Sequence, residues 1–256
     1  MPGGDRNDLD LLLSATKEAG TVAMGKFRKH PKSWHKPDGT TVTETDIAVD
    51  EFLRTTITKA RPDDGWLSEE TPNDGSRLQR GRFWIADPID GTRMFLAGED
   101  NWGIGVALIE DGEVQLSALL LPSQEKLFHA IRHEGAFLNG ERIALPASAS
   151  ASVIAPRSFA GALGEVGFQY QSGGHLPLLL RFTAIAEGRL AGAITLGEKN
   201  DWDVAAGHLI LKEAGGIVST GQGDNIVYNR GQAWQPGVVA AVPQWHGALV
   251  DLVRHH

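Results

Sequence analysis

The sequence predicts a mixed α and β protein in two halves: helices and a mostly antiparallel sheet first, then alternating helices and strands. Apolar residues recur at near-helical spacing over residues 7–29 and again from Asp46. Apolar runs joined by Asp-Gly and Asn-Gly pairs then indicate β-hairpins. The small, polar stretch "PASASAS" at 146–152 precedes the alternating pattern, so we expect an α+β half at 1–146 and an α/β half at 147–256.

The first half starts with the helix over 7–29, followed by the turn-rich loop "HKPDGTTVTETD", which runs into a short Thr/Val strand. Asp46 lies in the first turn or at the cap of the second helix. A brief strand is expected to end near Leu67. The run "RFWIA" predicts another strand, which should stop at Asp87 because a residue before proline avoids the helical region.

The antiparallel elements follow directly. The runs "NWGIGVALI" and "VQLSALLL" flank the turn "EDGE" and predict a hairpin centred on Asp-Gly. The segments "KLFHAIR" and "GAFLNGERI" predict further strands and an Asn-Gly turn.

The second half alternates between strand and helix. We expect a strand in "VIAPRSF", then a Gly-rich loop, a helix near 176–188 and a strand in "LAGAITL". The segment "DWDVAAGHLILKEAGG" predicts a helix with an acidic start and a Gly-Gly stop, as the helix dipole and a glycine C-cap favour. Strands in "GIVST" and "PGVVAAV" and a last helix from about Gln244 complete the chain.

Composition excludes several classes of protein. The chain has 256 residues, a formal charge of −8 and no cysteine, so disulfides, thiolate nucleophiles and cysteine metal sites are excluded. The negative charge and the lack of a long basic run argue against nucleic-acid polymers and anionic membranes as partners. No apolar run is long enough to span a bilayer, and the N-terminus lacks a signal pattern. We therefore expect a cytoplasmic protein.

Residues 84–95, "WIADPIDGTRMF", carry the strongest chemical signal. Asp87 and Asp90 follow an apolar strand, and two carboxylates this close repel each other unless a cation lies between them. Carboxylate oxygens and the Ile89 carbonyl are natural ligands of a hard divalent cation. Gly91 lets the backbone approach closely, and the amides after it would face an anion such as phosphate. The plainer interpretation, that both aspartates only cap or terminate local structure, suits an isolated Asp-x-x-Asp better than this longer string.

This string resembles the first signature of the inositol monophosphatase superfamily. The segment "DWDVAAGHLILKEAGG" resembles the second signature of that family, and "TVTETD" and "WLSEE" match two further segments in the family's order. The resemblance covers nearly the whole chain. It implies a layered α-β-α-β-α sandwich of the inositol monophosphatase and fructose-1,6-bisphosphatase type, with an acidic site between the two halves.

The resemblance also implies roles for individual residues. The metal ligands would be Glu69, Asp87, the Ile89 carbonyl, Asp90 and Asp203. Glu69 would face the catalytic water, which Asp46 and Thr92 would help to deprotonate and aim. Substrate contacts would come from Asp90, Gly91, Thr92, Arg93, Lys199 and Asp203, and Lys36 would lie in a mobile loop over the site. Taken singly, Asp46 and Asp203 are better explained by a cap or dipole role in the first turn of a helix, and Lys36 by a surface position, so the assignment depends on the joint occurrence of these segments.

The implied reaction is magnesium-dependent hydrolysis of a small phosphorylated metabolite by two-metal activation of water, with two or three Mg²⁺ ions and inhibition by Li⁺. Homodimers are common in such families. The alternative of another class is a catalytically weak, metal-binding regulatory protein. A dinucleotide-binding enzyme is disfavoured because no G-x-G-x-x-G follows the early strands.

The substrate is less well determined. Ala191, Gly192 and Leu196 stand near positions where inositol-specific members carry an Asp and a Glu. The basic residue after the Thr in "DGTRMF" and the segments "DWDVAAGHLI", "EAGG", "YNR" and "PGVVAA" look more like the 3'(2'),5'-bisphosphate nucleotidase branch of the family. The resemblance therefore implies a 3'(2'),5'-bisphosphate nucleotide as the leading substrate, and Arg93, Arg157 and Lys199 are the candidate cations for its second phosphate. Inositol monophosphate and histidinol phosphate remain alternatives, and fructose 1,6-bisphosphate a weaker one.

Overall fold

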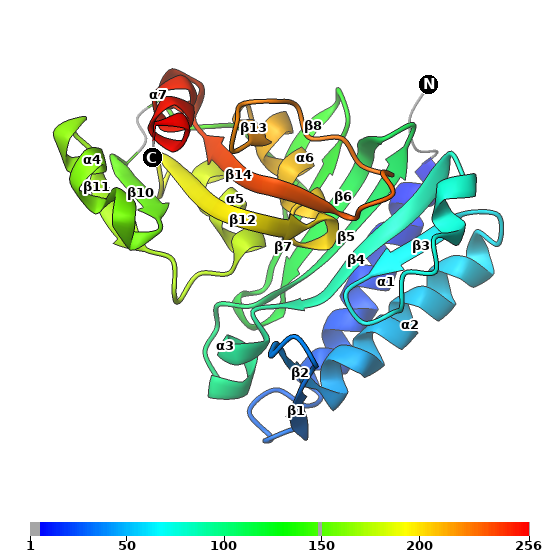
Figure 1. Ribbon diagram of the computed structural model, residues 1–256. Helices are drawn as coiled ribbons and strands as arrows, with labels where there is room; N and C mark the ends of the chain where they lie inside the picture. Colours follow the sequence, from blue (N-terminus) through cyan, green and yellow to red (C-terminus); the bar gives the residue numbers. More distant parts are fainter. Residues whose placement is uncertain (1–5, 148–149, 256) are drawn as a thin grey trace.

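Helices and sheets are stacked in five layers, which a computed structural model describes over residues 6–147 and 150–255 (Figure 1). Residues 148 and 149 of the breaker-rich stretch predicted at 146–152 lie outside this description. The layers alternate helix, sheet, helix, sheet, helix, so the expected α-β-α-β-α sandwich is confirmed. The division into halves at residue 146 remains a prediction.

The larger sheet has seven strands in the order β3-β4-β5-β6-β7-β8-β9. Its first pair is parallel and the others are antiparallel, as the hairpin signals indicated. The strands are β3 (Gly65–Ser68), β4 (Arg82–Asp90), β5 (Gly103–Glu110), β6 (Glu113–Leu121), β7 (Lys126–Ile131), β8 (Gly135–Leu138) and β9 (Glu141–Ile143).

Two helices cover one face of this sheet: α1 (Arg6–Met24) and α2 (Glu44–Ala60). Apolar residues of α1 recur every three or four positions, and they meet those of α2 and of β4 to β6 in one buried cluster. The helical part of this cluster is Leu12, Ala15, Ala19, Ala23, Val49, Leu53 and Ile57. A small hairpin of β1 (Ser33–His35) and β2 (Thr41–Thr43) leads into α2.

The other face of the seven-stranded sheet packs against α5 (Leu178–Ala186) and α6 (Ala205–Glu213). These two helices form the central layer, and their other side meets the second sheet. Gly105 of β5 permits their close approach, because a Cβ there would lie 2.5 Å from Leu179 Cδ1 and 3.3 Å from Ala206 Cβ.

The second sheet has five strands in the order β11-β10-β12-β14-β13. Two outer helices, α4 (Ala160–Glu165) and α7 (Pro243–Arg254), pack against its far face through residues such as Phe159, Leu163 and Leu249. The strands are β10 (Ser152–Ala155), β11 (Gln169–Ser172), β12 (Gly192–Asn200), β13 (Ile217–Thr220) and β14 (Trp234–Ala241). Short 3-10 turns lie at Ser76–Gln79, Pro122–Gln124, Arg157–Phe159 and Asp201–Asp203.

Both expected hairpin turns are present. Asp111 and Gly112 between β5 and β6 have φ values of 52° and 79°, and Asn139 and Gly140 between β8 and β9 have 52° and 87°. Two consecutive positive φ values define the type I′ turn, which Asp-Gly and Asn-Gly pairs favour. The Gly-Gly end of α6 is also confirmed, because Gly215 has φ 102° and the Gly216 amide bonds to the Leu211 carbonyl at 2.8 Å.

Three boundaries differ from those predicted. The first helix ends at Met24, just before Gly25, and not near residue 29. Strand β4 continues past Asp87 to Asp90. Pro88 is tolerated there because the pairing with β5 is irregular between Asp87 and Asp90, so the N–H that proline lacks is not needed for a hydrogen bond between the strands. Helix α4 and strand β11 occupy much of the expected Gly-rich loop.

No helix of residues 6–147 and 150–255 is long and apolar enough to cross a membrane.

Replacing Gly105 with alanine should lower the free energy of unfolding by about 1–3 kcal/mol, because the added methyl group forces Leu179 and α5 away from the sheet. The matched control is Gly161→Ala in α4, where a Cβ meets no atom within 4 Å. Urea unfolding of both variants measures the difference, and equal stability of the two would contradict this account of the packing.

Candidate functional site

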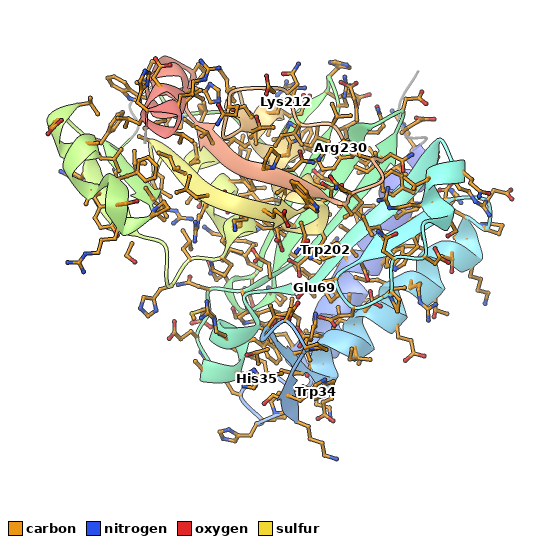
Figure 2. The ribbon with its side chains drawn as sticks, viewed as in Figure 1. Trp34, His35, Glu69, Trp202, Lys212 and Arg230 are labelled. Atoms are coloured by element: carbon orange, nitrogen blue, oxygen red, sulfur yellow. The ribbon has the colours of Figure 1, made fainter. Side chains whose placement is uncertain are left out.

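A pocket of about 700 Å³ lies between the end of β4, the β1–β2 hairpin, the start of α5 and the turn before α6. Several sequence-predicted residues line this pocket together: Glu69, Asp87, Ile89, Asp90, Gly91, Thr92, Arg93 and Asp203. They come from three separate segments of the chain. Figure 2 shows Glu69 and Trp202 close to where the two sheets meet, with Trp34 and His35 on the hairpin below.

The irregular end of β4 supplies the first two carboxylates. Asp87 pairs with Gly105 of β5 and Asp90 with Gly103, so the bulge between them brings both aspartates to the pocket. Asp87 is buried, and its Oδ1 atom has no hydrogen-bond partner among the described residues. Asp90 Oδ2 accepts a hydrogen bond from the Leu179 amide at 2.8 Å, which ties the end of β4 to the first turn of α5.

Gly91 follows with φ 98°, a conformation that favours glycine. A Cβ at this position would lie 2.6 Å from Pro177 Cγ and 3.0 Å from the Asn101 carbonyl oxygen, so a side chain is excluded on steric grounds as well. Helix α3 (Thr92–Ala97) begins directly after it. The Thr92 hydroxyl donates to Asp46 Oδ1 at 2.9 Å.

Asp46 has two structural duties. It is the third residue of a capping box at the start of α2, in which Thr43 Oγ1 accepts from the Asp46 amide at 3.3 Å and the Thr43 amide donates to Asp46 Oδ2 at 2.9 Å. Its other oxygen receives the Thr92 hydroxyl. Asp46 therefore takes part in the cap of α2, whose N-cap residue is Thr43, and it also contacts the pocket through Thr92.

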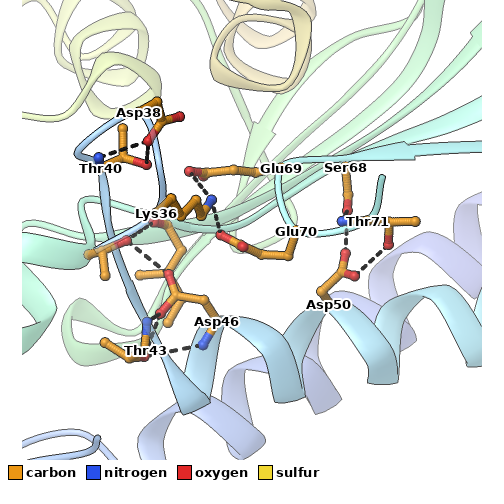
Figure 3. Close-up of polar contacts among 12 residues, drawn as sticks. Lys36, Asp38, Thr40, Thr43, Asp46, Asp50, Ser68, Glu69, Glu70 and Thr71 are labelled. Carbon is orange, nitrogen blue, oxygen red and sulfur yellow. Dashed lines mark hydrogen bonds and ion pairs between the residues drawn. The ribbon is translucent and has the colours of Figure 1, made fainter. Parts of the chain in front are cut away.

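Lys36 lies between two acidic side chains that follow β3 (Figure 3). Its Nζ atom is 3.0 Å from Glu69 Oε1 and 2.7 Å from Glu70 Oε1. Burial lowers the pKa of Lys36, but the contacts with Glu70 and Glu69 outweigh it, and the net pKa is raised. The β1–β2 hairpin is thereby attached to the acidic side of the pocket.

Asp203 reaches the pocket from the other sheet. It ends the 3-10 turn Asp201–Asp203 between β12 and α6, and its Oδ2 atom accepts a hydrogen bond from the Asn200 amide at 3.2 Å. Asp201 points elsewhere, because its Oδ1 atom accepts from Gln235 Nε2 at 2.7 Å in the interior. Of the two aspartates flanking Trp202, only Asp203 lines the pocket.

The gathered carboxylates change one another's acidity. Burial, and then the charges of Glu69 and Asp90, raise the pKa of Asp87 well above its ordinary value. Burial and the charge of Asp203 raise the pKa of Asp90 to about 8. Burial and the charge of Glu69 raise the pKa of Asp203 to about 7. Burial raises the pKa of Glu70 to about 7, although Lys36 opposes this shift.

The donor set suits a hard divalent cation, since every candidate ligand is a carboxylate or carbonyl oxygen. The unpartnered Oδ1 atom of buried Asp87 fits this role, because a buried anionic oxygen without a donor is costly unless a cation neutralises it. Among residues 6–147 and 150–255, no three His, Asp or Glu side chains are arranged, as they stand, so that they could hold a metal ion. Three of the acids instead accept hydrogen bonds from protein donors: Glu69 from Lys36 Nζ, Asp90 from the Leu179 amide and Asp203 from the Asn200 amide.

A second cavity of about 750 Å³ adjoins the pocket, and the two share Gly173 and Arg181 in their walls. Arg157 and Lys199 line this second cavity and not the acidic pocket. Arg181 was missed at the sequence level, because a single arginine in a predicted apolar helix gives no signal. Its Nε atom donates to the Leu176 carbonyl at 2.8 Å and its NH2 group to that of Gly173 at 3.0 Å.

Comparison with solved structures defines the fold. An inositol monophosphatase/NADP phosphatase, solved with Mg²⁺ and phosphate, superposes with a TM-score of 0.85, 23% sequence identity and coverage of 96% of this chain and 95% of that one. At this identity the likeness shows the fold alone.

Sequence comparison identifies the family. The model of the inositol monophosphatase family matches residues 6–256. A histidinol-phosphatase of Chlorobaculum parvum is 34% identical over 82% of this chain and 84% of its own length. A protein of Streptomyces griseus named glucose-1-phosphate thymidylyltransferase is 36% identical over 83% and 86%. The chain belongs to the inositol monophosphatase family, and it is a phosphatase that acts on small phosphorylated substrates.

The raised pKa values predict how stability depends on pH. Asp90 and Asp203 have folded-state pKa values of about 8 and about 7 against ordinary values of 3.8, so the folded state binds more protons than the unfolded state up to these values. These two carboxyl groups therefore stabilise the metal-free protein fully below about pH 4, and their contribution is lost as the pH rises to about 8. The part of this loss between about pH 6.5 and about pH 8 lies above the ordinary histidine pKa, so histidine titration does not offset it. Thermal unfolding in chelator measures the slope, which Asp90→Asn should reduce; a melting temperature that rises with pH would contradict the assignment.

Proposed function

We propose that this phosphatase hydrolyses phosphate monoesters in the acidic pocket with divalent magnesium. The observation that carries the proposal is the convergence of Glu69, Asp87, Asp90 and Asp203 from both sheets on one pocket, with an unpartnered buried oxygen on Asp87. Such a group of carboxylates is costly without a cation. The phosphatase of the same fold that was solved with Mg²⁺ and phosphate supports the choice of ion.

The residues that would hold magnesium are Glu69, Asp87, Asp90, Asp203 and the carbonyl of Ile89. When bound, the ions supply an acidified water and neutralise charge on the phosphate and on the leaving oxygen. How many ions bind, two or three, is part of the proposal, as is inhibition by lithium.

Thr92 and Asp46 would orient the attacking water. The Thr92 hydroxyl has one proton, and its oxygen lies 2.9 Å from Asp46 Oδ1 and 3.2 Å from the Ile89 carbonyl oxygen. With the proton donated to Asp46, the shorter of the two contacts, the lone pairs of the Thr92 oxygen accept a hydrogen bond from water. Burial raises the pKa of Asp46, while its bonds to Thr43 and Thr92 oppose the shift. Asp46 thus fixes the direction of the Thr92 hydroxyl and serves as a final proton acceptor.

Phosphate oxygens would meet the backbone amides of Gly91 and Thr92. Gly91 is required there, because any Cβ would collide with Pro177 and the Asn101 carbonyl. Lys36 lies in the turn of the β1–β2 hairpin, and its contacts with Glu69 and Glu70 connect the hairpin to the acidic side of the pocket. We propose that this hairpin is the mobile cover of the site.

For the substrate we propose a 3'(2'),5'-bisphosphate nucleotide. The second cavity carries three cations, Arg157, Arg181 and Lys199, and no carboxylate among the described residues that line it. It shares a wall with the acidic pocket, so an ester hydrolysed in the pocket could place a second phosphate there. Tyr170 and Leu196 add apolar surface of the kind that covers a base or a sugar.

Histidinol phosphate is the second candidate, because a histidinol-phosphatase is 34% identical over most of both chains. Its cationic amine would face the same three cations, which makes it a poorer fit to the second cavity. Inositol monophosphate, uncharged beyond its phosphate, gains nothing from these cations. A catalytically weak regulatory protein is the alternative of another class, and absence of any turnover would favour it.

Asp90→Asn tests the metal assignment. Loss of this carboxylate should reduce magnesium-dependent phosphate release at least about 100-fold. Removing a residue that only hydrogen-bonds to a metal ligand costs up to about 100-fold, and Asp90 is proposed to be a ligand itself. Phosphate release should be measured with the bisphosphate nucleotide, inositol 1-phosphate, histidinol phosphate and fructose 1,6-bisphosphate, with and without lithium. Near-normal activity of the variant would refute the assignment.

The double variant Arg157→Ala, Lys199→Ala tests the substrate. It should raise KM for the bisphosphate nucleotide about tenfold, in line with two lost charge-assisted contacts, and leave KM for inositol 1-phosphate within about twofold. Lys212→Ala, an exposed lysine outside both cavities, is the control. An equal change in KM for both substrates would count against the second phosphate site.

A further inference from the structure

Helix α2 carries a second buried aspartate one turn after Asp46. Residues i and i+4 lie on the same helical face, so Asp46 and Asp50 both point to the loops at the ends of the sheet. Both are almost fully buried, with 1% and 5% of their surface exposed. Asp46 bonds to Thr92 after β4, whereas Asp50 bonds to the turn after β3.

The Asp50 carboxylate accepts hydrogen bonds from the first and the last residue of that turn (Figure 3). Its Oδ1 atom accepts the Ser68 hydroxyl, and its Oδ2 atom accepts the Thr71 hydroxyl at 2.7 Å. The Thr71 amide in turn donates to Ser68 Oγ at 3.1 Å. All three bonds fasten the flanks of a four-residue turn whose two middle residues are Glu69 and Glu70.

The turn has little other support near the pocket. Strand β3 is the edge of the seven-stranded sheet, and among the described strands its one partner is β4, so its end is held from one side. The side chains of Glu69 and Glu70 contact Lys36, which belongs to the hairpin and not to the sheet. Asp50 is the group that connects the turn to a rigid helix packed on the core.

We propose that Asp50 is a positioning residue for Glu69. Through Ser68 and Thr71 it fixes where Glu69 projects relative to Asp87 and Asp90, while Asp46 on the same helix fixes Thr92. Helix α2 therefore sets the spacing between the two loops that supply the acidic pocket from the first sheet. The inference rests on the proposed function, in which Glu69 binds a divalent cation.

The test is direct binding of Mn²⁺, followed by the loss of the free-ion EPR signal, together with the Mg²⁺ dependence of phosphate release. Asp50→Ala should weaken Mn²⁺ binding about tenfold or more and raise the half-activating Mg²⁺ concentration by the same factor. At saturating Mg²⁺, KM for the ester should stay within about twofold. Asp50→Asn keeps an oxygen for Ser68 and should show a smaller change.

Two further variants separate positioning from general destabilisation. Thr71→Val removes one of the two bonds to Asp50 and should weaken Mn²⁺ binding in a protein that still folds. Glu51→Ala, the exposed neighbour on the same helix, should leave Mn²⁺ binding unchanged. If Asp50→Ala and Thr71→Val bind Mn²⁺ like the wild type, or if only their melting temperatures fall, Asp50 is merely structural and the inference is overturned.

The proposed function and this inference fail differently. A wild-type protein that binds no Mn²⁺ overturns both. A wild-type protein that binds Mn²⁺ but hydrolyses no ester, with weakened binding in Asp50→Ala, refutes the proposed reaction and supports the positioning role.

Discussion

The structure depends on holding several carboxylates together against their mutual repulsion. Asp87 lies in the interior without a donor on one oxygen, and its pKa is raised by burial and by the acids around it. Such an arrangement opposes folding and persists only where surrounding packing over-determines it. Here that packing comes from α5 and α6, the two helices between the sheets. Helix α5 places the Leu179 amide next to Asp90, and Asp203 lies directly before the start of α6.

The scaffold and the pocket are therefore built by the same contacts. Gly105 lets α5 and α6 lie against β5, and one turn of α5 then offers the Leu179 amide to Asp90. On the opposite side of the sheet, α2 packs through Val49 and Leu53 and presents Asp46 at its capped start. Apolar faces fix the helices, and their polar ends hold the acids, so a shift in core packing is transmitted to the pocket.

Much of this could be predicted from sequence because the signals are local or carried by long motifs. The Asp-Gly and Asn-Gly turns require only two positive φ values, and the Gly-Gly end of α6 requires one. The continuation of β4 through Pro88 could not be foreseen, since it depends on a register shift against β5. Arg181 and Asp50 were not recognised, because their partners lie in other segments and a single charged residue in a helix has many ordinary explanations.

The bond between Asp90 and the Leu179 amide has a consequence for how the molecule comes into being. During synthesis the first sheet emerges from the ribosome well before Leu179 and Asp203, and domains fold in the order in which they appear. The acids of β4 are therefore synthesised before Leu179 and Asp203 are present. The acidic pocket is thus completed late, because Asp203, which lines it, is added only after most of the chain has been made.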